Sequence, residues 1–270
     1  MRLVEPKVFL IGKTTVNRTV AKEWLNHIGA DKYALEDDVS GGEQLIQLAG
    51  KRCYMSFQPG LNPNVERVRT DMASFIENIL KVGHGSVIEH AVYNFAIEGV
   101  SRVFTGEMNR HRAGMAISEG SMRFIRFTDI PFWQPTSLQI NDDDTEPIKE
   151  RKRITWEIFK GVITKVEDSY RLLEELWASE LAPTSSFKEK KHLTSMFRRI
   201  VPMGVATGGV WSGNLRALRH IFTMRCDKAA EEEILLVASK MLALMIETEP
   251  LFFQDFHLVD GYWQPTHRKV

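Results

Sequence analysis

The amino-acid sequence predicts an α+β fold, in which helices and strands are mixed without the regular strand–helix alternation of a Rossmann domain. Some segments show apolar residues at helical spacing, and others show the alternation of a half-buried strand. No GxGxxG motif and no Walker loop is present. The 270 residues are 43% hydrophobic and 26% charged, which is ordinary for a globular protein. We expect a single domain over residues 1–270.

The first hundred residues contain the clearest strand signals. Residues 7–11 form a short apolar run that ends at Gly12, which predicts an opening or edge strand. Tyr93, Phe95 and Ile97 alternate with small or polar residues, the period of a half-buried strand. Between these strands the apolar spacing predicts helices over residues 15–29, 42–56 and 65–83. Loops are expected at residues 36–42 and 56–60.

The second half of the chain is predicted to be mostly helical. Residues 128–150 are rich in Pro, Asp and Thr, which indicates a surface excursion. Residues 149–179 form a long amphipathic helix whose apolar stripe begins at Ile154 and ends at Trp177. Residues 214–225 and 227–246 are also helical, and the sequence separates them weakly if at all.

The charge balance narrows the class of ligand. Lys plus Arg and Asp plus Glu each total 35, so the formal net charge is zero. A global basic field is absent, which argues for a small anionic ligand and against a nucleic-acid partner. The two cysteines form no metal-binding or disulfide pattern, so we expect no metal site. The N-terminus lacks the apolar core of a signal peptide and no 18 apolar residues run together, which predicts a cytoplasmic protein without a membrane partner.

Three segments are dense in groups that bind anions: residues 83–90, 109–124 and 214–225. In the second, Arg110 and Arg112 offer planar forks suited to phosphate, diphosphate or a flat heterocycle. The sequence Ser-Glu-Gly-Ser follows at 118–121, and its small residues allow backbone N–H groups to approach a phosphate. An isolated Arg-His-Arg is more often a solvated charge cluster. The added loop favours a ligand.

The third segment places its cations on different sides of a predicted helix. Arg216 and His220 lie four residues apart, on one face. Arg225 follows Arg216 by nine residues, and nine steps of about 100° turn it to the opposite side. One helix can therefore direct Arg216 and His220 at one ligand and Arg225 at another. An exposed basic helix face is the alternative reading.

Together the three segments resemble the signature of flavin-dependent thymidylate synthases. Arg110-His111-Arg112 followed by Ser118-Glu119-Gly120-Ser121-Met122-Arg123-Phe124 resembles the family's Arg-His-Arg and Asn-Glu-x-Ser-x-Arg-Tyr. Residues 83–90 are similar to Gly-His-x-Thr-x-x-Glu-His, with Ser86 in place of threonine. Residues 214–216 and 224–225 resemble its Asn-x-Arg and later Leu-Arg. The resemblance covers about residues 56–234 and is looser at 128–195, which we interpret as a family-variable region.

The resemblance implies a mostly antiparallel central sheet flanked by helices and a homotetramer with FAD between subunits. It also implies that NADPH reduces the flavin and that 5,10-methylenetetrahydrofolate supplies the carbon that becomes the C5 methyl of dUMP. The cofactor-binding residues it implies are Ser56, His84, Ser86, Glu89, Arg110, His111, Arg112, Glu119, Asn214, Arg216 and His220. The substrate-binding residues are Glu107, Arg110, Glu119, Gly120, Ser121, Met122, Arg123, Arg198 and Arg225.

Arg225 is the expected catalytic residue in this set. Uracil C5 is a weak nucleophile until negative charge builds on the ring, as when N3 loses its proton. A guanidinium stays protonated, so Arg225 cannot act as a base. It can stabilise the anionic ring, which is an electrostatic role. Ser121 and Arg123 suit the nucleotide phosphate, with Arg198 closing over the nucleotide.

The sequence departs from the family pattern in ways that bear on the substrate. Eight residues, not seven, separate Arg112 from Ser121. The residues that differ from the family are Met122 for glycine, Phe124 for tyrosine, Ala229 for histidine, His220 for asparagine and Glu107 for glutamine. A carboxylate beside a bound phosphate is costly unless it is paired or turned away. A related C5-methylase acting on another uridine nucleotide, such as UMP, is therefore the alternative function.

Two other classes of function remain open from the residues alone. Cys226 offers the nucleophile of a cysteine-dependent thymidylate synthase. It is adjacent to Arg225, however, and a helix rotates by about 100° per residue, so the two side chains would not share a face. A buried structural thiol is the favoured interpretation. A nucleic-acid-binding protein also uses Arg and His clusters, but the zero net charge disfavours that class.

Overall fold

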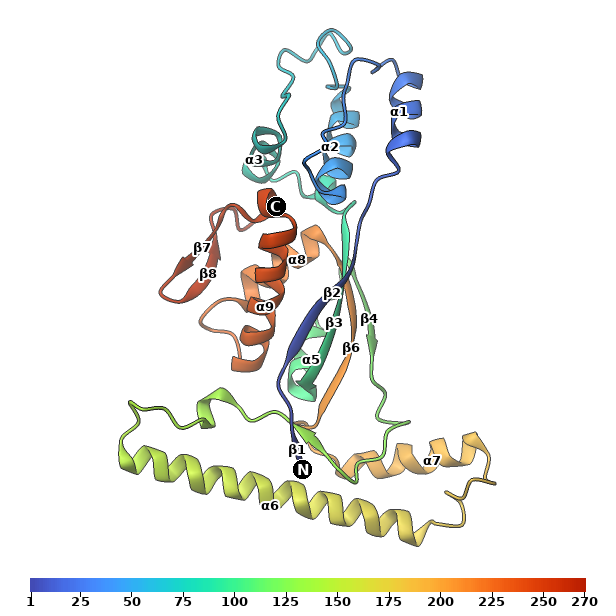
Figure 1. Cartoon of the computed structure of the whole chain (residues 1–270), viewed down its shortest axis with the longest axis vertical. Helices are drawn as coiled ribbons and strands as arrows, with labels where there is room; N and C mark the ends of the chain where they lie inside the picture. The colour runs from blue at the N-terminus through green and yellow to red at the C-terminus, as the bar shows by residue number, and fades with distance from the viewer.

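The computed structural model describes all 270 residues as an elongated molecule with a sheet at its centre (Figure 1). The strands are β1 (Arg2–Leu3), β2 (Lys7–Lys13), β3 (Val92–Ser101), β4 (Met115–Glu119), β5 (Pro131–Phe132), β6 (Ala206–Asn214), β7 (Phe256–Val259) and β8 (Tyr262–Pro265). The α-helices are α1 (Arg18–His27), α2 (Gly41–Tyr54), α3 (Met72–Val82), α4 (Gly85–Ile88), α5 (Arg102–Met108), α6 (Glu146–Leu176), α7 (Phe187–Phe197), α8 (Leu215–Arg225), α9 (Glu232–Thr248) and α10 (Pro250–Phe253).

The central sheet has four antiparallel strands in the order β2-β3-β6-β4, so the α+β prediction and the antiparallel sheet are confirmed. Its strands alternate apolar and small or polar residues, and Phe95 lies opposite Leu10 on one side and Trp211 on the other. The register shifts at Gly99, which adopts φ +73°, and a Cβ there would lie 2.5 Å from the Glu5 carbonyl oxygen. Glycine is therefore required at this bulge.

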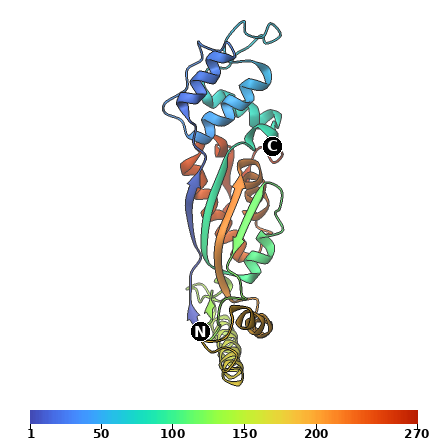
Figure 2. The same cartoon turned by 90° about the vertical axis from the view of Figure 1, so that its right-hand side faces the viewer.

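Helices cover one face of the sheet and leave the other face bare (Figures 1 and 2). Tyr93, Phe95, Ile97 and Trp211 are fully buried against α8 and α9 in a core of 29 residues. On the opposite face Phe9 and Ile11 are 51% and 57% exposed. One side of each strand therefore lies in the core, and the other side is covered by nothing within this chain.

The two helices of that layer are separate, which corrects the expectation of a weak break or none. α8 ends at Arg225, and α9 begins only at Glu232. Glu231 is the N-cap of α9, and its carboxylate accepts hydrogen bonds from the backbone N–H groups of Glu233 and Ile234. This cap starts a new helix, so that Arg225 lies at a free helix end.

The helix before Gly83 is shorter than its apolar spacing predicts. Asp71 accepts a hydrogen bond from the Ser74 backbone N–H at 2.8 Å and caps α3, so the helix begins at Met72. Val65 and Val68 keep helical spacing but lie in the preceding loop. The local cap overrides the longer apolar pattern. The helices expected at 15–29 and 42–56 correspond to α1 and α2, with boundaries shifted by a few residues.

An arm made by α6 and α7 extends beyond the end of the sheet (Figure 1). It has its own core, which contains Ile130, Phe132, Tyr170 and Phe197. Residues 128–150 are therefore only partly a surface excursion, since Ile130 and Phe132 are buried. The stripe predicted on the long helix is divided: Tyr170 is buried, whereas Ile154, at the other end, is 53% exposed.

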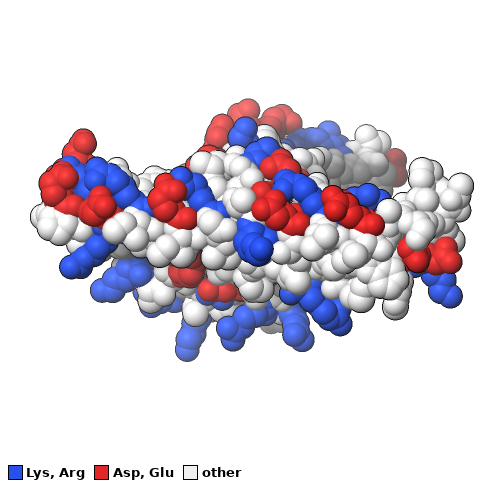
Figure 3. Space-filling model, turned by 90° about the horizontal axis from the view of Figure 1, so that it is seen from below, with Lys and Arg blue, Asp and Glu red and all other residues white.

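The surface of the arm mixes charges of both signs. Seen from below, Lys and Arg side chains alternate with Asp and Glu, and uncharged surface lies between them (Figure 3). No helix of the structure combines the length and the apolar character that a membrane crossing needs.

Candidate active site

The guanidinium of Arg225, at the end of α8, is held by two side chains from the region of α5. Its Nε donates a hydrogen bond to Nε2 of His111 at 3.0 Å, and its Nη1 forms an ion pair with Glu107 at 2.7 Å. The ring of His220 lies 5.9 Å from the ring of His111. Residues of the second and third sequence motifs are therefore in contact. The two anchors fix Arg225 and leave Nη2 without a partner in the chain.

His111 is held in its neutral form by its surroundings. Burial, followed by the positive charges of Arg225 and the neighbouring His220 and Arg110, lowers the pKa of His111 to about 4. A neutral imidazole carries one proton, and Nε2 accepts the bond from Arg225. The proton therefore lies on Nδ1, which remains available as a donor to a ligand.

Glu119, at the end of β4, is fixed by two side chains, Arg102 and Asn109, that were not predicted as site residues. Arg102 pairs with its carboxylate and also donates to the carbonyl of Gly120. Asn109 donates to the other carboxylate oxygen at 3.0 Å and accepts a bond from Trp211 Nε1 at 3.1 Å. Both oxygens of Glu119 thus have partners within the chain. Its predicted ligand contacts would use the remaining lone pairs.

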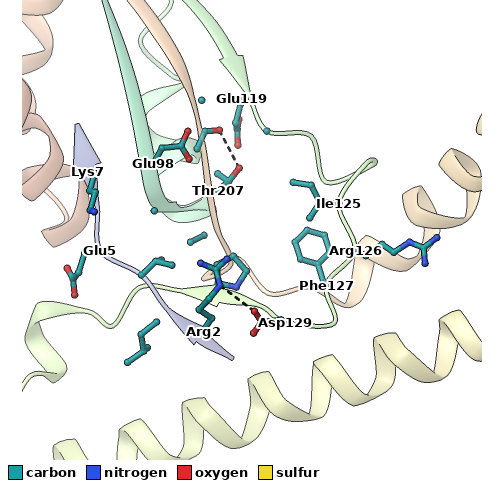
Figure 4. Close-up of a pocket in the computed structure, with 18 of the residues that line it drawn as sticks. Arg2, Glu5, Lys7, Glu98, Glu119, Ile125, Arg126, Phe127, Asp129 and Thr207 are labelled. Atoms are coloured by element: carbon teal, nitrogen blue, oxygen red, sulfur yellow. Dashed lines mark hydrogen bonds and ion pairs between the residues drawn. The ribbon is translucent and has the colours of Figure 1, made fainter. Parts of the chain in front are cut away.

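A cavity of about 1120 Å³ lies on the bare face of the sheet, next to Glu119 and Gly120 (Figure 4). The N-terminal segment forms its other wall, where Arg2 pairs with Asp129 at 3.3 Å. Charged residues of both signs line it, including Arg126 and Glu98. The cavity is large enough for a nucleotide.

The first motif meets the third at the start of α8. Asn214 is the N-cap, and its side-chain oxygen accepts a hydrogen bond from the Ala217 backbone N–H at 2.9 Å. Arg216 forms an ion pair with Glu89 at 2.6 Å, and both side chains are about half exposed. Ser86 is exposed in the short helix α4. Arg216 and Glu89, both predicted to touch the flavin, are therefore neighbours.

Ser56 and His84 lie together in a smaller cavity of about 200 Å³ between α2 and α3. The ring of Tyr54 stacks on His84, with centroids 6.2 Å apart. Arg67 and Arg69 also line the cavity. A stacked aromatic pair beside cations suits a flat anionic group.

The loop predicted to hold the phosphate lies at the arm. Arg123 lines a cavity of about 780 Å³ with Lys191 and His192 of α7. Arg198 follows directly after α7. Within one chain, no hydrogen bond or ion pair joins Ser121, Met122, Arg123 or Arg198 to the cluster around Arg225.

The site residues are thus spread over several surfaces of one protomer. Arg110 and Arg112 are exposed between the Arg225 cluster and the turn into β4. Arg102 was not predicted, although its place directly after strand β3 and before the Arg-His-Arg motif was visible in the sequence. Arg219 of α8 forms an ion pair with Asp255 at 2.9 Å, and no such signal predicted this contact, because the two residues are 36 positions apart.

Cys226 is fully buried, as the favoured interpretation predicted. Burial raises the pKa of its thiol to about 12, so the thiolate form is disfavoured. A nucleophilic role for this residue has no support in the structure.

Comparison with known proteins decides the family. Residues 34–251 match the family model described as Thymidylate synthase complementing protein. A flavin-dependent thymidylate synthase of Mycobacterium leprae (strain Br4923) is 32% identical over 227 residues, which cover 83% of this chain and 85% of that relative. The chain belongs to the flavin-dependent thymidylate synthase family. A relative of the same name from Mycolicibacterium gilvum (strain PYR-GCK) is 31% identical and covers 94% of this chain and 92% of its own length.

This member of the flavin-dependent thymidylate synthase family also has the fold of solved structures. The UMP/dUMP methylase PolB from Streptomyces cacaoi, bound with 5-Br UMP, has a TM-score of 0.60 at 14% identity, with 94% of each chain covered. Thymidylate Synthase X (ThyX) from Helicobacter pylori, with FAD and dUMP, has a TM-score of 0.56 at 18% identity, covering 93% of this chain and 98% of that one. The family resemblance and the assignment to enzymes are confirmed.

Proposed function

We propose that the protein methylates dUMP at C5 to give dTMP, with 5,10-methylenetetrahydrofolate as carbon donor and NADPH as reductant through FAD. The observation that carries the proposal is the contact of Arg225 with His111. It joins a residue expected to hold the pyrimidine to one expected to hold the flavin. Reductive transfer of a carbon between two bound molecules requires these two sites to adjoin.

The residues around this contact fit a flavin dinucleotide. Arg110 and Arg112 are exposed cations with planar forks, and neutral His111 offers an Nδ1–H donor. When bound, the flavin supplies the hydride chemistry, and the protein positions and polarises the reactants. We assign Arg110, His111, Arg112, Arg216 and His220 to the flavin.

Arg225 would act on the pyrimidine. Its Nη2 group has no partner in the chain, so it can face an anionic uracil ring while His111 and Glu107 keep the guanidinium in place. A fixed cation beside the ring favours the form that has lost the N3 proton, and this form is nucleophilic at C5. We assign Ser121, Arg123 and Arg198 to the phosphate of the nucleotide.

A homotetramer is part of this proposal. The phosphate-binding residues and Arg225 do not meet within one chain, and one face of the sheet is bare. Both facts are explained if a neighbouring copy covers that face and brings its own loop to the site.

Glu107 supports a second candidate, a C5-methylase that acts on UMP. It places a carboxylate beside Arg225, and a carboxylate can accept a hydrogen bond from the ribose 2′-hydroxyl. If it does, Glu107→Gln shifts the ratio of UMP to dUMP methylation toward dUMP. If Glu107 only holds Arg225, the same change leaves the ratio unaltered.

Anaerobic NADPH oxidation with methylenetetrahydrofolate and a panel of uridine nucleotides tests the function. The expected result is oxidation that depends on dUMP and gives dTMP by mass spectrometry. Dependence on UMP, with a 5-methyl-UMP product, supports the second candidate. Absence of bound flavin, with no oxidation on any uridine nucleotide, rejects both.

A further inference from the structure

A small cationic pocket lies between α8 and the C-terminal segment that follows β8. Its volume is about 370 Å³. Arg216, Arg219, His220 and Thr223 line one side, and residues 267–270 line the other. No Asp or Glu side chain is part of the lining. Six Arg, His and Lys side chains converge here in a protein whose net charge is zero, which makes the pocket locally basic.

A buried ion pair fixes the wall of this pocket. Arg219 donates to both carboxylate oxygens of Asp255, at 2.9 and 3.0 Å, and the two side chains are only 4% and 7% exposed. Asp255 also accepts the backbone N–H of His267 at 3.0 Å, and Arg219 donates to the carbonyl of His267 at 3.3 Å. The segment after β8 is thus clamped along α8. The charge of Arg219 is neutralised, while its buried Nε–H still lacks a partner.

Two of the other cations of the pocket remain free, whereas Arg216 is paired with Glu89. Arg268 and Lys269 are exposed and form no ion pair. The Nε of Arg216 donates a hydrogen bond to the main-chain oxygen of Val270 at 3.1 Å, so the guanidinium of Arg216 faces the C-terminal segment. Gly85 is part of the same junction, because a Cβ there would lie 2.5 Å from the carbonyl carbon of Val270. The C-terminal segment therefore lies directly against residues of the first and third motifs.

We infer that His267, Arg268 and Lys269 complete, with Arg216, a binding site for the diphosphate group of a dinucleotide. The pocket is too small for a whole dinucleotide but has room for this group. Arg268 and Lys269 are uncompensated cations that match its charge, and the planar forks of Arg216 and Arg268 match its oxygens. The inference rests on the proposed function in one respect: FAD is the expected source of the diphosphate, because Arg216 and His220 are assigned to the flavin.

The test is a double variant, Arg268→Gln with Lys269→Gln, in the full chain. Arg151→Gln with Lys165→Gln, two exposed cations on α6, is the matched control. Dissociation constants are measured for FAD, riboflavin, NADPH and inorganic diphosphate. We expect FAD to bind at least about tenfold more weakly and diphosphate binding to be lost. Riboflavin, which has no phosphate, should bind as in the wild type, and the control should match the wild type for all four.

The other possible results of these binding measurements either overturn or support the diphosphate site. FAD, NADPH and diphosphate affinities within twofold of wild type in the double variant would overturn the inference. Weaker binding of NADPH alone, measured with the flavin site saturated, supports the site with NADPH as the source. If the wild type binds no flavin, the proposed function fails. The diphosphate site is then tested by itself: it is supported if the wild type binds diphosphate or NADPH and the double variant does not, and it is overturned if the two proteins bind them equally. Circular dichroism checks that both double variants are folded.

Discussion

At the scale of single residues, the position of Arg225 is determined by its two anchors. Glu107 and His111 come from one short stretch, and both bind the same guanidinium. Removing Arg225 leaves Glu107 as an unpaired carboxylate that is only 30% exposed. The cluster is therefore a unit, and a change at one member alters the others.

Arg225→Ala should keep its flavin but lose at least about tenfold in methyl transfer, or ~1.4 kcal/mol of barrier. The flavin is retained because Arg110, Arg112 and Arg216 remain. Arg225→Lys should not restore the rate. An ammonium lacks the planar fork with which the guanidinium can contact His111, Glu107 and the ring at the same time. Arg199→Ala, an exposed arginine next to Arg198, is the control. Unaltered turnover of Arg225→Ala on every pyrimidine nucleotide would contradict the role given to this residue.

The pKa of His111 gives a second residue-scale prediction. In the folded chain the pKa of His111 is about 4, whereas in the unfolded chain the pKa of a histidine is about 6.5. Acidification from pH 6.5 to 4 therefore favours the unfolded state, and His111→Asn should weaken this acid sensitivity. An NMR titration of the His111 ring, assigned with the variant, should show no midpoint near 6.5. A midpoint there would mean that burial and Arg225 do not keep the ring neutral.

At the scale of elements, local caps explain where the apolar pattern fails. The N-cap Asp71 makes α3 begin later than the apolar spacing from Val65 predicts. The N-cap Glu231 begins a new helix, α9, after α8 has ended. The sheet was easier to predict, because the alternation around Phe95 reports directly on one buried face. The motifs predicted that Arg225, Glu107 and His111 contact ligands, but they did not predict that the three side chains bind one another. Helical spacing gives the side of a helix on which a residue lies and says nothing of which distant element packs there.

Glu249, where α9 ends, provides a prediction about how elements are joined. Its carboxylate accepts a bond from Ser40, the N-cap of α2, and is fully buried. Burial, and then the nearby Glu43 carboxylate, raise the pKa of Glu249 to about 7. Because the folded pKa lies above the unfolded one, this group lowers stability as pH rises from about 4.5 to 7.

Glu249→Gln should therefore stabilise the protein at pH 8 by on the order of 1–3 kcal/mol and have little effect at pH 4.5. The amide keeps the acceptor for Ser40 and removes the buried charge. Urea unfolding of both proteins at the two pH values measures the difference. Glu247→Gln, two residues earlier on α9, is the control. Equal stabilisation at both pH values would show that the charge of Glu249 is not the cause.

At the scale of the whole molecule, the uncovered apolar surface has two parts. Phe9 and Ile11 lie on the bare face of the sheet, and both are more than half exposed. Ile154, Ile158 and Val162 follow one another at four-residue spacing on α6, with exposed fractions of 53%, 60% and 54%. Surfaces of this kind mark protein–protein contacts, and a second copy of this chain covers them in the proposed tetramer.

We therefore expect the wild type to sediment at about four times the chain mass of 31.0 kDa. Phe9→Glu with Ile11→Glu should reduce that mass, because two carboxylates cannot be buried at a sheet-on-sheet contact without partners. The same variant should lose flavin in parallel, since the proposed tetramer holds FAD between its subunits. Val20→Glu on α1, also 54% exposed, is the control and should stay tetrameric. A wild type that sediments as a single chain with full activity, or a double variant that keeps both its mass and its flavin, would show that the bare face of the sheet does not build the site.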